Sequence, residues 1–245
     1  MRIKEVIRKL IPKRILDYII KVRIDILDSY ATKSYSQEGE DMVLKGIFGN
    51  QKTGFYIDIG AHHPKRFSNT FYFYKQGWSG INVDPIPGTK KLFDKVRPND
   101  INLEFGITDQ PQELTYFIFN EPALNTFDKE LYVSRSKNPK WKLVDSKTIK
   151  TVTLTSILER YIPNMQSNLA NIDFMTIDVE GFELQVLKSN DWKKYRPRFL
   201  LVESLNADIE LLQNSCPIYN FLKNENYILH GRTNRTFFYK DLLRS

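Results

Sequence analysis

Three acidic residues, Asp58, Asp84 and Asp178, each follow a short apolar run that ends abruptly. Such a run, stopped by a polar turn, is typical of a buried strand. In open α/β sheets, ligands bind beyond the carboxyl ends of the strands, where the strand order reverses. An ionised carboxylate there can accept hydrogen bonds from both hydroxyls of a ribose. Asp84, which ends the second strand, therefore predicts a nucleoside site, although an acid can also simply terminate a strand.

The turn over residues 58–64 narrows the class of nucleoside. A dinucleotide-binding turn has the pattern G-x-G-x-x-G, whose glycines let the backbone approach a pyrophosphate. Here Gly60 is the only glycine, and His62, His63 and Pro64 follow it. A ligand without phosphates does not need that cradle, and S-adenosylmethionine is the leading candidate. The missing glycines also weigh against a nicotinamide-dependent sugar oxidoreductase, as does the absence of a recognisable Tyr-x-x-x-Lys pair.

Alternating strands and helices must position these residues. Strands are predicted at 55–59, 80–84, 101–107, 113–119, 149–153, 172–179, 198–203, 226–230 and 235–240, and helices near 68–76, 88–96, 154–161, 182–189 and 207–224. Residues 120–148 are expected to be a long irregular stretch, which is usually a functional lid or a disordered insertion. This alternation predicts the α/β fold class, with a mostly parallel, doubly wound sheet and helices on both faces.

Composition sets further bounds. With 245 residues, 41% of them hydrophobic and 27% charged, the chain is expected to form one large globular, soluble domain. The single cysteine, Cys216, excludes an internal disulfide framework and fits a reducing compartment. No Cys/His cluster has the spacing of a zinc site. We therefore expect a cytoplasmic protein.

The positive charge is concentrated at the N-terminus. Residues 1–33 hold nine basic and four acidic side chains, a net +5 that leaves only +2 of the total +7 for the rest. That distribution argues against a nucleic-acid partner. Apolar residues of 3–11 and 15–22 recur at helical spacing, interrupted by Pro12. This extension is predicted either to cap the domain or form a dimer contact, or to lie on an anionic membrane surface at the inner face.

Several segments together resemble one known family. The chain is similar to FkbM-family S-adenosylmethionine-dependent methyltransferases, which are often found in polysaccharide biosynthesis clusters. The matching segments are residues 35–41, 58–64, 67–70, 80–85, 121–127 and 177–181. Their order and spacing make the match specific, over about residues 34–203. The resemblance implies a Rossmann-like class I methyltransferase fold; the N-terminal segment and the C-terminal tail lie outside it. We expect the methyltransferase domain at 34–245, after a basic amphipathic helical extension at 1–33.

The resemblance also implies roles for individual residues. Candidate contacts of the methionine part are Asp58, Gly60 and Ala61; Asp84 holds the ribose; Thr108 and Asp109 border the adenine; and Asp178 and Glu180 lie beside the transferring methyl group. The general class I pattern D-x-G-x-G-x-G has glycines where His62 and Pro64 stand here. With His62 and Pro64 in place of two glycines, the backbone is expected to follow a different path around the methionine tail from the usual one.

Methyl transfer to a sugar hydroxyl calls for a proton acceptor, because such a hydroxyl is a poor nucleophile at neutral pH. His62 and His63 are candidates, since an unperturbed imidazole has a pKa of about 6.5. In that role, one histidine faces the site while its neighbour packs or caps the following helix. The alternative is that each histidine is structural. Asp178 and Glu180 are alternative bases or oxygen ligands for a divalent cation. No metal site is assigned.

Other polar and aromatic residues have two interpretations each. Glu40 and Asp41 either reach the site or begin a helix that Ser36 caps. The aromatic residues from Phe67 to Trp78 are expected in the core rather than on a sugar-binding platform. Asn125 and Thr126 can hydrogen-bond the hydroxyls of an acceptor.

The favoured function is therefore O-methylation of a sugar hydroxyl on a glycan, lipid-linked oligosaccharide or nucleotide sugar in surface glycan biosynthesis, with S-adenosylmethionine as cofactor. The alternative is a non-catalytic protein that keeps the fold and docks on a membrane or a complex through residues 1–33. The oligomeric state and the identity of the acceptor stay open.

Overall fold

The computed structural model describes residues 11–27, 30–162, 172–204 and 216–244. The chain divides into two units, residues 1–34 and residues 35–245. The helix predicted over 3–11 and the first part of the helix predicted over 207–224 lie outside the described residues.

The first unit contains one described helix, α2 (Lys13–Asp25), which begins directly after Pro12 and buries none of its residues. Its apolar side chains are exposed, with Ile15 at 52%, Tyr18 at 69% and Ile19 at 46% of their full accessible surface. Within the described part of the chain, no helix has the length and apolar character needed to cross a membrane.

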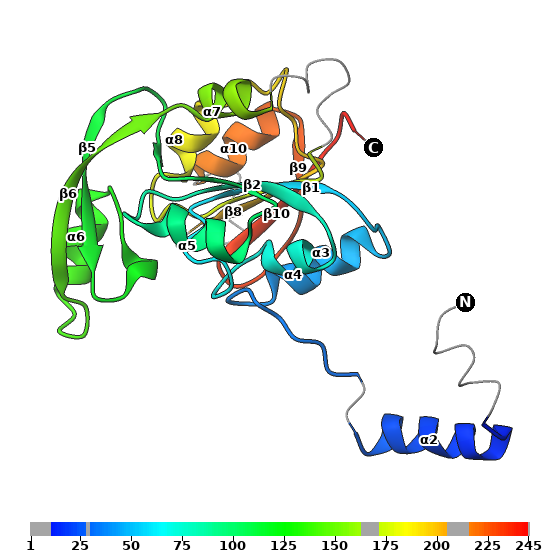
Figure 1. Ribbon diagram of the computed structural model, residues 1–245. Coiled ribbons are helices and arrows are strands. Elements are labelled where there is room, and N and C mark those ends of the chain that lie inside the picture. The colour runs from blue at the N-terminus through cyan, green and yellow to red at the C-terminus, as the bar shows by residue number, and fades with distance from the viewer. Residues whose placement is uncertain (1–10, 28–29, 163–171, 205–215, 245) are drawn as a thin grey trace. The chain divides into compact units, whose positions relative to one another are not determined.

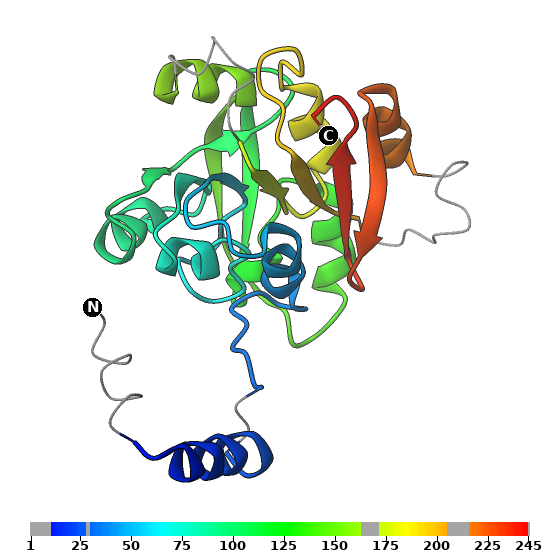
Figure 2. The same cartoon turned by 90° about the vertical axis from the view of Figure 1, so that its right-hand side faces the viewer.

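The second unit is organised around a seven-stranded sheet in the order β3-β2-β1-β7-β8-β10-β9. Its strands are β1 (Phe55–Ile59), β2 (Ser79–Val83), β3 (Ile101–Leu103), β7 (Phe174–Ile177), β8 (Phe199–Glu203), β9 (Tyr227–Arg232) and β10 (Thr236–Asp241). Strands β3, β2, β1, β7 and β8 pair in parallel, while β10 runs antiparallel to both of its neighbours. Figure 2 shows β9 and β10, in orange and red, side by side. The predicted mostly parallel α/β sheet is confirmed.

Helices cover both faces of this sheet (Figure 1). The larger apolar core packs α7 (Leu154–Tyr161), α8 (Glu183–Lys188) and α10 (Pro217–Asn224) on one face. The second core packs α3 (Glu40–Phe48) and α4 (Phe71–Lys75) on the other. Alternate residues of β1 divide between them, because successive side chains of a strand point to opposite faces: Ile57 and Ile59 enter the first core and Tyr56 the second.

A second, three-stranded sheet extends the domain on one side, in the order β4-β6-β5. It contains β4 (Gly106–Ile107), β5 (Glu113–Phe119) and β6 (Leu143–Val152), with the short helix η1 (Pro122–Leu124) and helix α6 (Lys129–Ser136) between β5 and β6. Figure 1 shows this sheet beside the main one, in green. Two predictions were therefore wrong: residues 101–107 are two strands in different sheets, and residues 120–148 are not irregular.

The sequence did not predict the full length of β6, the longest strand of the second sheet, because most of this strand has no buried face. Residues 143–148 of β6 are exposed throughout, so the sequence shows no alternation of apolar and polar residues there. What holds β6 in place is backbone pairing with β5, for example Thr115 opposite Thr148. Smaller differences are the shorter helix α4 and the start of α3, where Gly39 rather than Ser36 is the N-cap.

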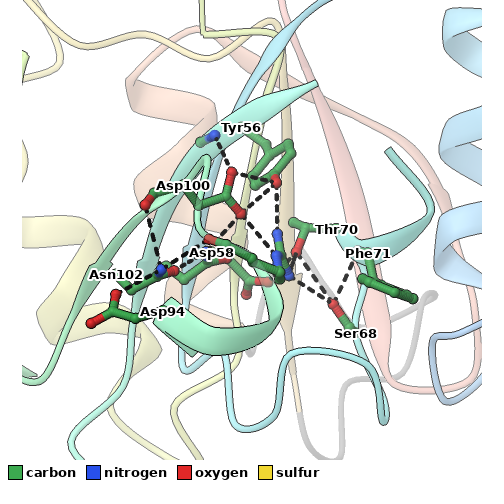
Figure 3. Close-up of polar contacts among 11 residues, drawn as sticks. Tyr56, Asp58, Ser68, Thr70, Phe71, Asp94, Asp100 and Asn102 are labelled. Atoms are coloured by element: carbon green, nitrogen blue, oxygen red, sulfur yellow. Dashed lines mark hydrogen bonds and ion pairs between the residues drawn. The ribbon is translucent and has the colours of Figure 1, made fainter. Parts of the chain in front are cut away.

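A buried polar network fastens β1 and β2 to the loop before β3. Arg97 and Asp100 are fully buried and form an ion pair with 2.8 Å between Nε and Oδ2. Arg97 also donates to the Tyr56 hydroxyl and to Thr70 Oγ1, and Asp100 accepts the backbone N–H of Gly80. Figure 3 shows the side chains of Tyr56, Asp100, Thr70 and Ser68 converging on this network. A buried ion pair needs such additional hydrogen bonds to offset its desolvation.

Asp58 belongs to this network. Its Oδ2 accepts a 2.6 Å hydrogen bond from the Thr70 hydroxyl. Burial raises the pKa of Asp58 to about 6, against smaller lowering effects of Thr70 and Arg97. Its carboxylate therefore carries an uncompensated desolvation cost when it is ionised.

Gly60, directly after β1, passes unusually close to the strand-end backbone of β7. A Cβ placed on Gly60 would lie 1.7 Å from the carbonyl oxygen of Asp178, and the φ of Gly60 is +81°. The N–H groups of Gly60 and Ala61 both donate to the carbonyl of Val83 at the end of β2. Gly60 thus lies where the ends of β1, β2 and β7 approach one another, and its lack of a side chain permits their close spacing.

We expect Gly60→Ala to destabilise the domain by about 3 kcal/mol or more, because overpacking adds to the cost of a left-handed backbone. Gly77→Ala is the matched control, since Gly77 has a φ of +94° and open space around its Cβ position. It should cost only about 1–2 kcal/mol. Urea unfolding of both variants measures the difference, and equal losses would refute the importance of the close approach.

The raised pKa of Asp58 predicts a pH-dependent stability. The folded state holds the proton of Asp58 more tightly than the unfolded chain does. The resulting contribution to the free energy of unfolding is therefore fully present below pH 3.8 and is lost as the pH rises through about 6. The free energy of unfolding of Asp58→Asn, relative to that of the wild type, should therefore rise by about 2–3 kcal/mol between pH 4 and pH 7. Urea unfolding across this range measures the gain. The exposed Asp145→Asn control should show none.

Candidate active site

An open cleft lies beyond the carboxyl ends of β1, β2 and β7. Its empty space, open solvent at the mouth included, is about 740 Å³. Gly60, Asp84 and the segment 178–180 line it from the main sheet. Since β2 and β7 flank β1, the cleft is at the point where the strand order reverses.

The opposite wall comes largely from the second sheet and is mainly apolar. Tyr116 and Phe127 face the cleft there, together with Phe105 and Ile107 from the segment that enters β4. Flat apolar side chains of this kind can hold an aromatic ring. Asn125 lines the same wall: its Oδ1 accepts the N–H of Phe119 at 2.8 Å, while its buried Nδ2 makes no hydrogen bond within the described residues.

Asp84 is held by the backbone of the turn. Its Oδ2 accepts the N–H of His62 at 2.7 Å, and its Oδ1 accepts the N–H of Ile86 at 2.8 Å. Burial raises the pKa of Asp84 to about 6, while the two backbone N–H groups act in the opposite direction. The carboxylate is therefore mostly ionised at pH 7, and each oxygen keeps accepting capacity for a ligand in the cleft.

His62 faces the cleft without a partner. Both of its ring nitrogens are buried and make no hydrogen bond to any described residue. Burial lowers the pKa of His62 to about 4, and the charge of Arg66 lowers it further. The imidazole is therefore neutral at physiological pH and has a nitrogen available to accept a proton.

His63 has a different environment. Its Nδ1 accepts the backbone N–H groups of Lys65 and Arg66, both at 3.0 Å, and it does not line the cleft. The two neighbouring histidines thus have different places: His62 borders the cleft, and His63 closes the turn that follows.

Backbone strain is concentrated around the cleft. Among the described residues other than glycine, four have a positive φ, and three of these line the cleft: His62 at 53°, Phe67 at 56° and Glu180 at 54°. Such conformations cost about 1–3 kcal/mol each and persist where the surrounding structure enforces them, which is commonly at functional sites.

Asp178 and Glu180 both border the cleft, but their carboxylates have different partners. Glu180 forms an ion pair with Arg135 of α6, and its carbonyl accepts a hydrogen bond from the Thr126 hydroxyl. Asp178 lies instead near Glu183 and Glu203. Burial, with the charge of Glu203 next, raises the pKa of Asp178 well above its usual range. Burial likewise raises the pKa of Glu203 to about 8.

The remaining predicted cofactor residues do not line the cleft. Asp58 points into the buried network, and Ala61 contributes its N–H to Val83. Thr108 is buried, with its hydroxyl bonded to the carbonyl of Gln110, and Asp109 is exposed. The residues that line this part of the cleft are Phe105 and Ile107.

The other candidates also have defined places. Asp41 accepts hydrogen bonds from the Tyr35 N–H and the Ser36 hydroxyl, and Glu40 from the Thr233 hydroxyl, so both are used at the start of α3. Phe71, Phe73 and Trp78 are buried, as expected of core residues. Phe67 differs, because it is 39% exposed and lines the cleft.

Sequence reasoning missed several residues of the site. Glu203, the last residue of β8, follows an apolar run in the sequence as Asp58 does, so the same signal was available for it. Arg135, Tyr116 and Phe127 belong to the second sheet and its connections, and nothing in their spacing marks them.

The strand order, the reversed strand β10 and the cleft at the reversal point define a Rossmann-like domain of the methyltransferase type. A family model described as "Methyltransferase FkbM domain" matches residues 58–229. The chain belongs to this family of methyltransferases. No curated protein and no solved structure matches the chain.

Proposed function

We propose that this chain binds S-adenosylmethionine in the cleft and transfers its methyl group to a sugar hydroxyl of a glycan-type acceptor. The observation that carries the proposal is the pairing, in one cleft, of a backbone-held carboxylate, Asp84, with a neutral, unpartnered imidazole, His62. The sugar class of the acceptor rests on the family resemblance.

The residues present fit a sulfonium nucleoside. Asp84 offers acceptor oxygens for a ribose diol, and the wall of Phe105, Ile107 and Phe127 suits the adenine ring. The unpartnered Nδ2 of Asn125 is a donor for an acceptor atom of the ligand. S-adenosylmethionine supplies an activated methyl group for an in-line displacement, so the main task of the protein is positioning.

In this proposal His62 accepts the proton of the acceptor hydroxyl. A pKa near 4 makes its imidazole a weak base, so proton transfer has to accompany the formation of the new bond. Asp178 is the alternative acceptor, because it lines the same cleft and its pKa is raised. His63 has no such role here, since its Nδ1 is occupied by two backbone donors.

Isothermal titration with S-adenosylmethionine tests the cofactor. We expect saturable binding to the wild-type chain and at least a tenfold weaker affinity for Ala123→Trp, which places a bulky ring in the cleft. Asp84→Asn should also weaken binding at least tenfold, because an amide cannot accept from both backbone N–H groups and a ribose.

Asp109→Asn is the matched control for this titration. Asp109 was predicted beside the adenine but lies outside the cleft lining, so its variant should bind like the wild type. Thermal unfolding of each variant checks that it is folded. Absence of binding to a folded wild-type sample at millimolar cofactor would refute the proposal and favour the non-catalytic docking function.

We further propose that residues 1–33 hold the protein at the cytoplasmic face of an anionic membrane. The support is the net charge of +5 on this segment and the unburied apolar residues of α2. Helices with exposed apolar side chains and basic residues bind interfaces by combining apolar burial with attraction to anionic lipids.

Sedimentation with vesicles of phosphatidylglycerol and phosphatidylcholine tests this proposal. The double variant Ile15→Ser/Ile19→Ser should bind at least tenfold more weakly than the wild type, because each exposed isoleucine would lose about 1.5–3 kcal/mol of burial. The control Val133→Ser/Val144→Ser removes two exposed apolar side chains of the second unit and should bind normally. Equal partitioning of all three proteins would exclude membrane docking by α2.

A further inference from the structure

Three carboxylates meet at the inner end of the cleft. Asp178 follows β7, Glu183 is the first residue of α8, and Glu203 is the last residue of β8. One oxygen from each lies within 4.8 Å of the other two. Glu183 and Glu203 are buried, and Asp178 lines the cleft. The adjacency of β7 and β8 brings together residues that are far apart in the sequence.

The Glu183 carboxylate is oriented by the loop that it caps. Its Oε1 accepts the N–H of Val179 at 3.0 Å and that of Gly181 at 3.1 Å. The N–H of Gly181 also lies 3.2 Å from Oε2. These bonds point the carboxylate back toward the end of β7 and leave accepting capacity on Oε2 for a further partner. The position of Glu183 is therefore set by the fold and does not depend on a ligand.

Glu203 is the unsatisfied member of the cluster. It is only 5% exposed, and its Oε2 makes no hydrogen bond within the described part of the chain. It faces Asp178, and two ionised carboxylates can only accept hydrogen bonds. Either a shared proton or a cation has to lie between them, since an unpaired buried charge is costly.

The neighbouring arginines are paired with other carboxylates, although the charge of Arg235 acts on Glu203 from a distance and lowers its pKa against the larger raising effect of burial. Arg135 is paired with Glu180, and Arg235 has its Nε 4.0 Å from Glu38. Among the described residues, no lysine or arginine forms an ion pair with any of the three carboxylates. One shared proton would remove only one of the three negative charges, whereas a divalent cation removes two.

We propose that Asp178, Glu183 and Glu203 bind a divalent cation of the hard, oxygen-preferring class, such as Mg²⁺, Mn²⁺ or Ca²⁺. Oxygens within 4.8 Å of one another fit a shell in which each ligand is about 2.0–2.6 Å from the ion. The binding of the ion does not depend on the proposed function. Its use does rest on that function: because Asp178 borders the cleft, the open side of the ion would face an acceptor hydroxyl and orient it.

Titration of the full chain with Mn²⁺ alone, followed by electron paramagnetic resonance, tests the site without cofactor or acceptor. We expect one ion per chain, displaced by Mg²⁺ or Ca²⁺. Glu203→Gln should lower the Mn²⁺ affinity at least tenfold, and the exposed Glu159→Gln should leave it unchanged. Because no S-adenosylmethionine is present, this result is independent of whether the cofactor proposal holds.

Thermal unfolding distinguishes loss of the site from loss of the fold. Without metal, Glu203→Gln should melt at a higher temperature than the wild type, because it removes one buried negative charge from the cluster. Mn²⁺ should raise the melting temperature of the wild type and of Glu159→Gln, but not of Glu203→Gln. The proposal fails if the wild type binds no Mn²⁺ at millimolar concentration, or if Glu203→Gln binds it equally well. A proton shared by Asp178 and Glu203 would then be the remaining explanation.

Discussion

The close approach of Gly60 to the carbonyl of Asp178 is the constraint on which the cleft depends. A side chain at Gly60 would occupy the space of the β7 strand end, so β1 and β7 could not finish at the same level. The next two N–H groups then continue the same path: Ala61 donates to Val83, and His62 donates to the Asp84 carboxylate. One glycine and a carboxylate thus shape a turn that pyrophosphate-binding proteins build from several glycines. His62 stands in this turn where the glycine-rich pattern has a glycine, and its side chain lines the cleft.

The sequence predicts the main sheet well because its strands are short apolar runs with clear ends. Asp58 shows where that reasoning stops. In the sequence it follows an apolar run as Asp84 does, but in the structure it lies within β1 opposite Asn82, and its carboxylate enters the network of Arg97 and Asp100. Asp58 shares a face of β1 with Tyr56, whose hydroxyl belongs to the same network, while Ile57 and Ile59 occupy the other face. An acid that follows an apolar run therefore locates the edge of the sheet, but whether its side chain can reach a ligand depends on its exact position relative to the strand end.

Contacts between distant segments account for the rest of what the sequence did not predict. Glu203 is the last residue of its strand and follows an apolar run, but its contact with Asp178 depends on the pairing of β8 with β7. The spacing of residues along the chain carries no information about that pairing. Strand β6 is a similar case, because its exposed residues are ordered by backbone hydrogen bonds to β5. The wall of the cleft that contains Tyr116 and Phe127 follows from this sheet.

Two ion pairs join the walls of the cleft, and they contribute unequally to its stability. Arg66 and Glu121 pair at the rim, where their side chains are 44% and 37% exposed, and an exposed pair contributes only about 0–1 kcal/mol. Arg135 and Glu180 form a largely buried pair, with side-chain exposures of 8% and 16%, and the Thr126 hydroxyl adds a hydrogen bond to the Glu180 carbonyl. The left-handed backbone of Glu180 is therefore enforced from the second sheet, while that of His62 is enforced from Asp84 on the main sheet. The strained backbones of His62 and Glu180, both on the main-sheet side of the cleft, are thus each held by a largely buried polar contact, and neither depends on the weakly paired rim.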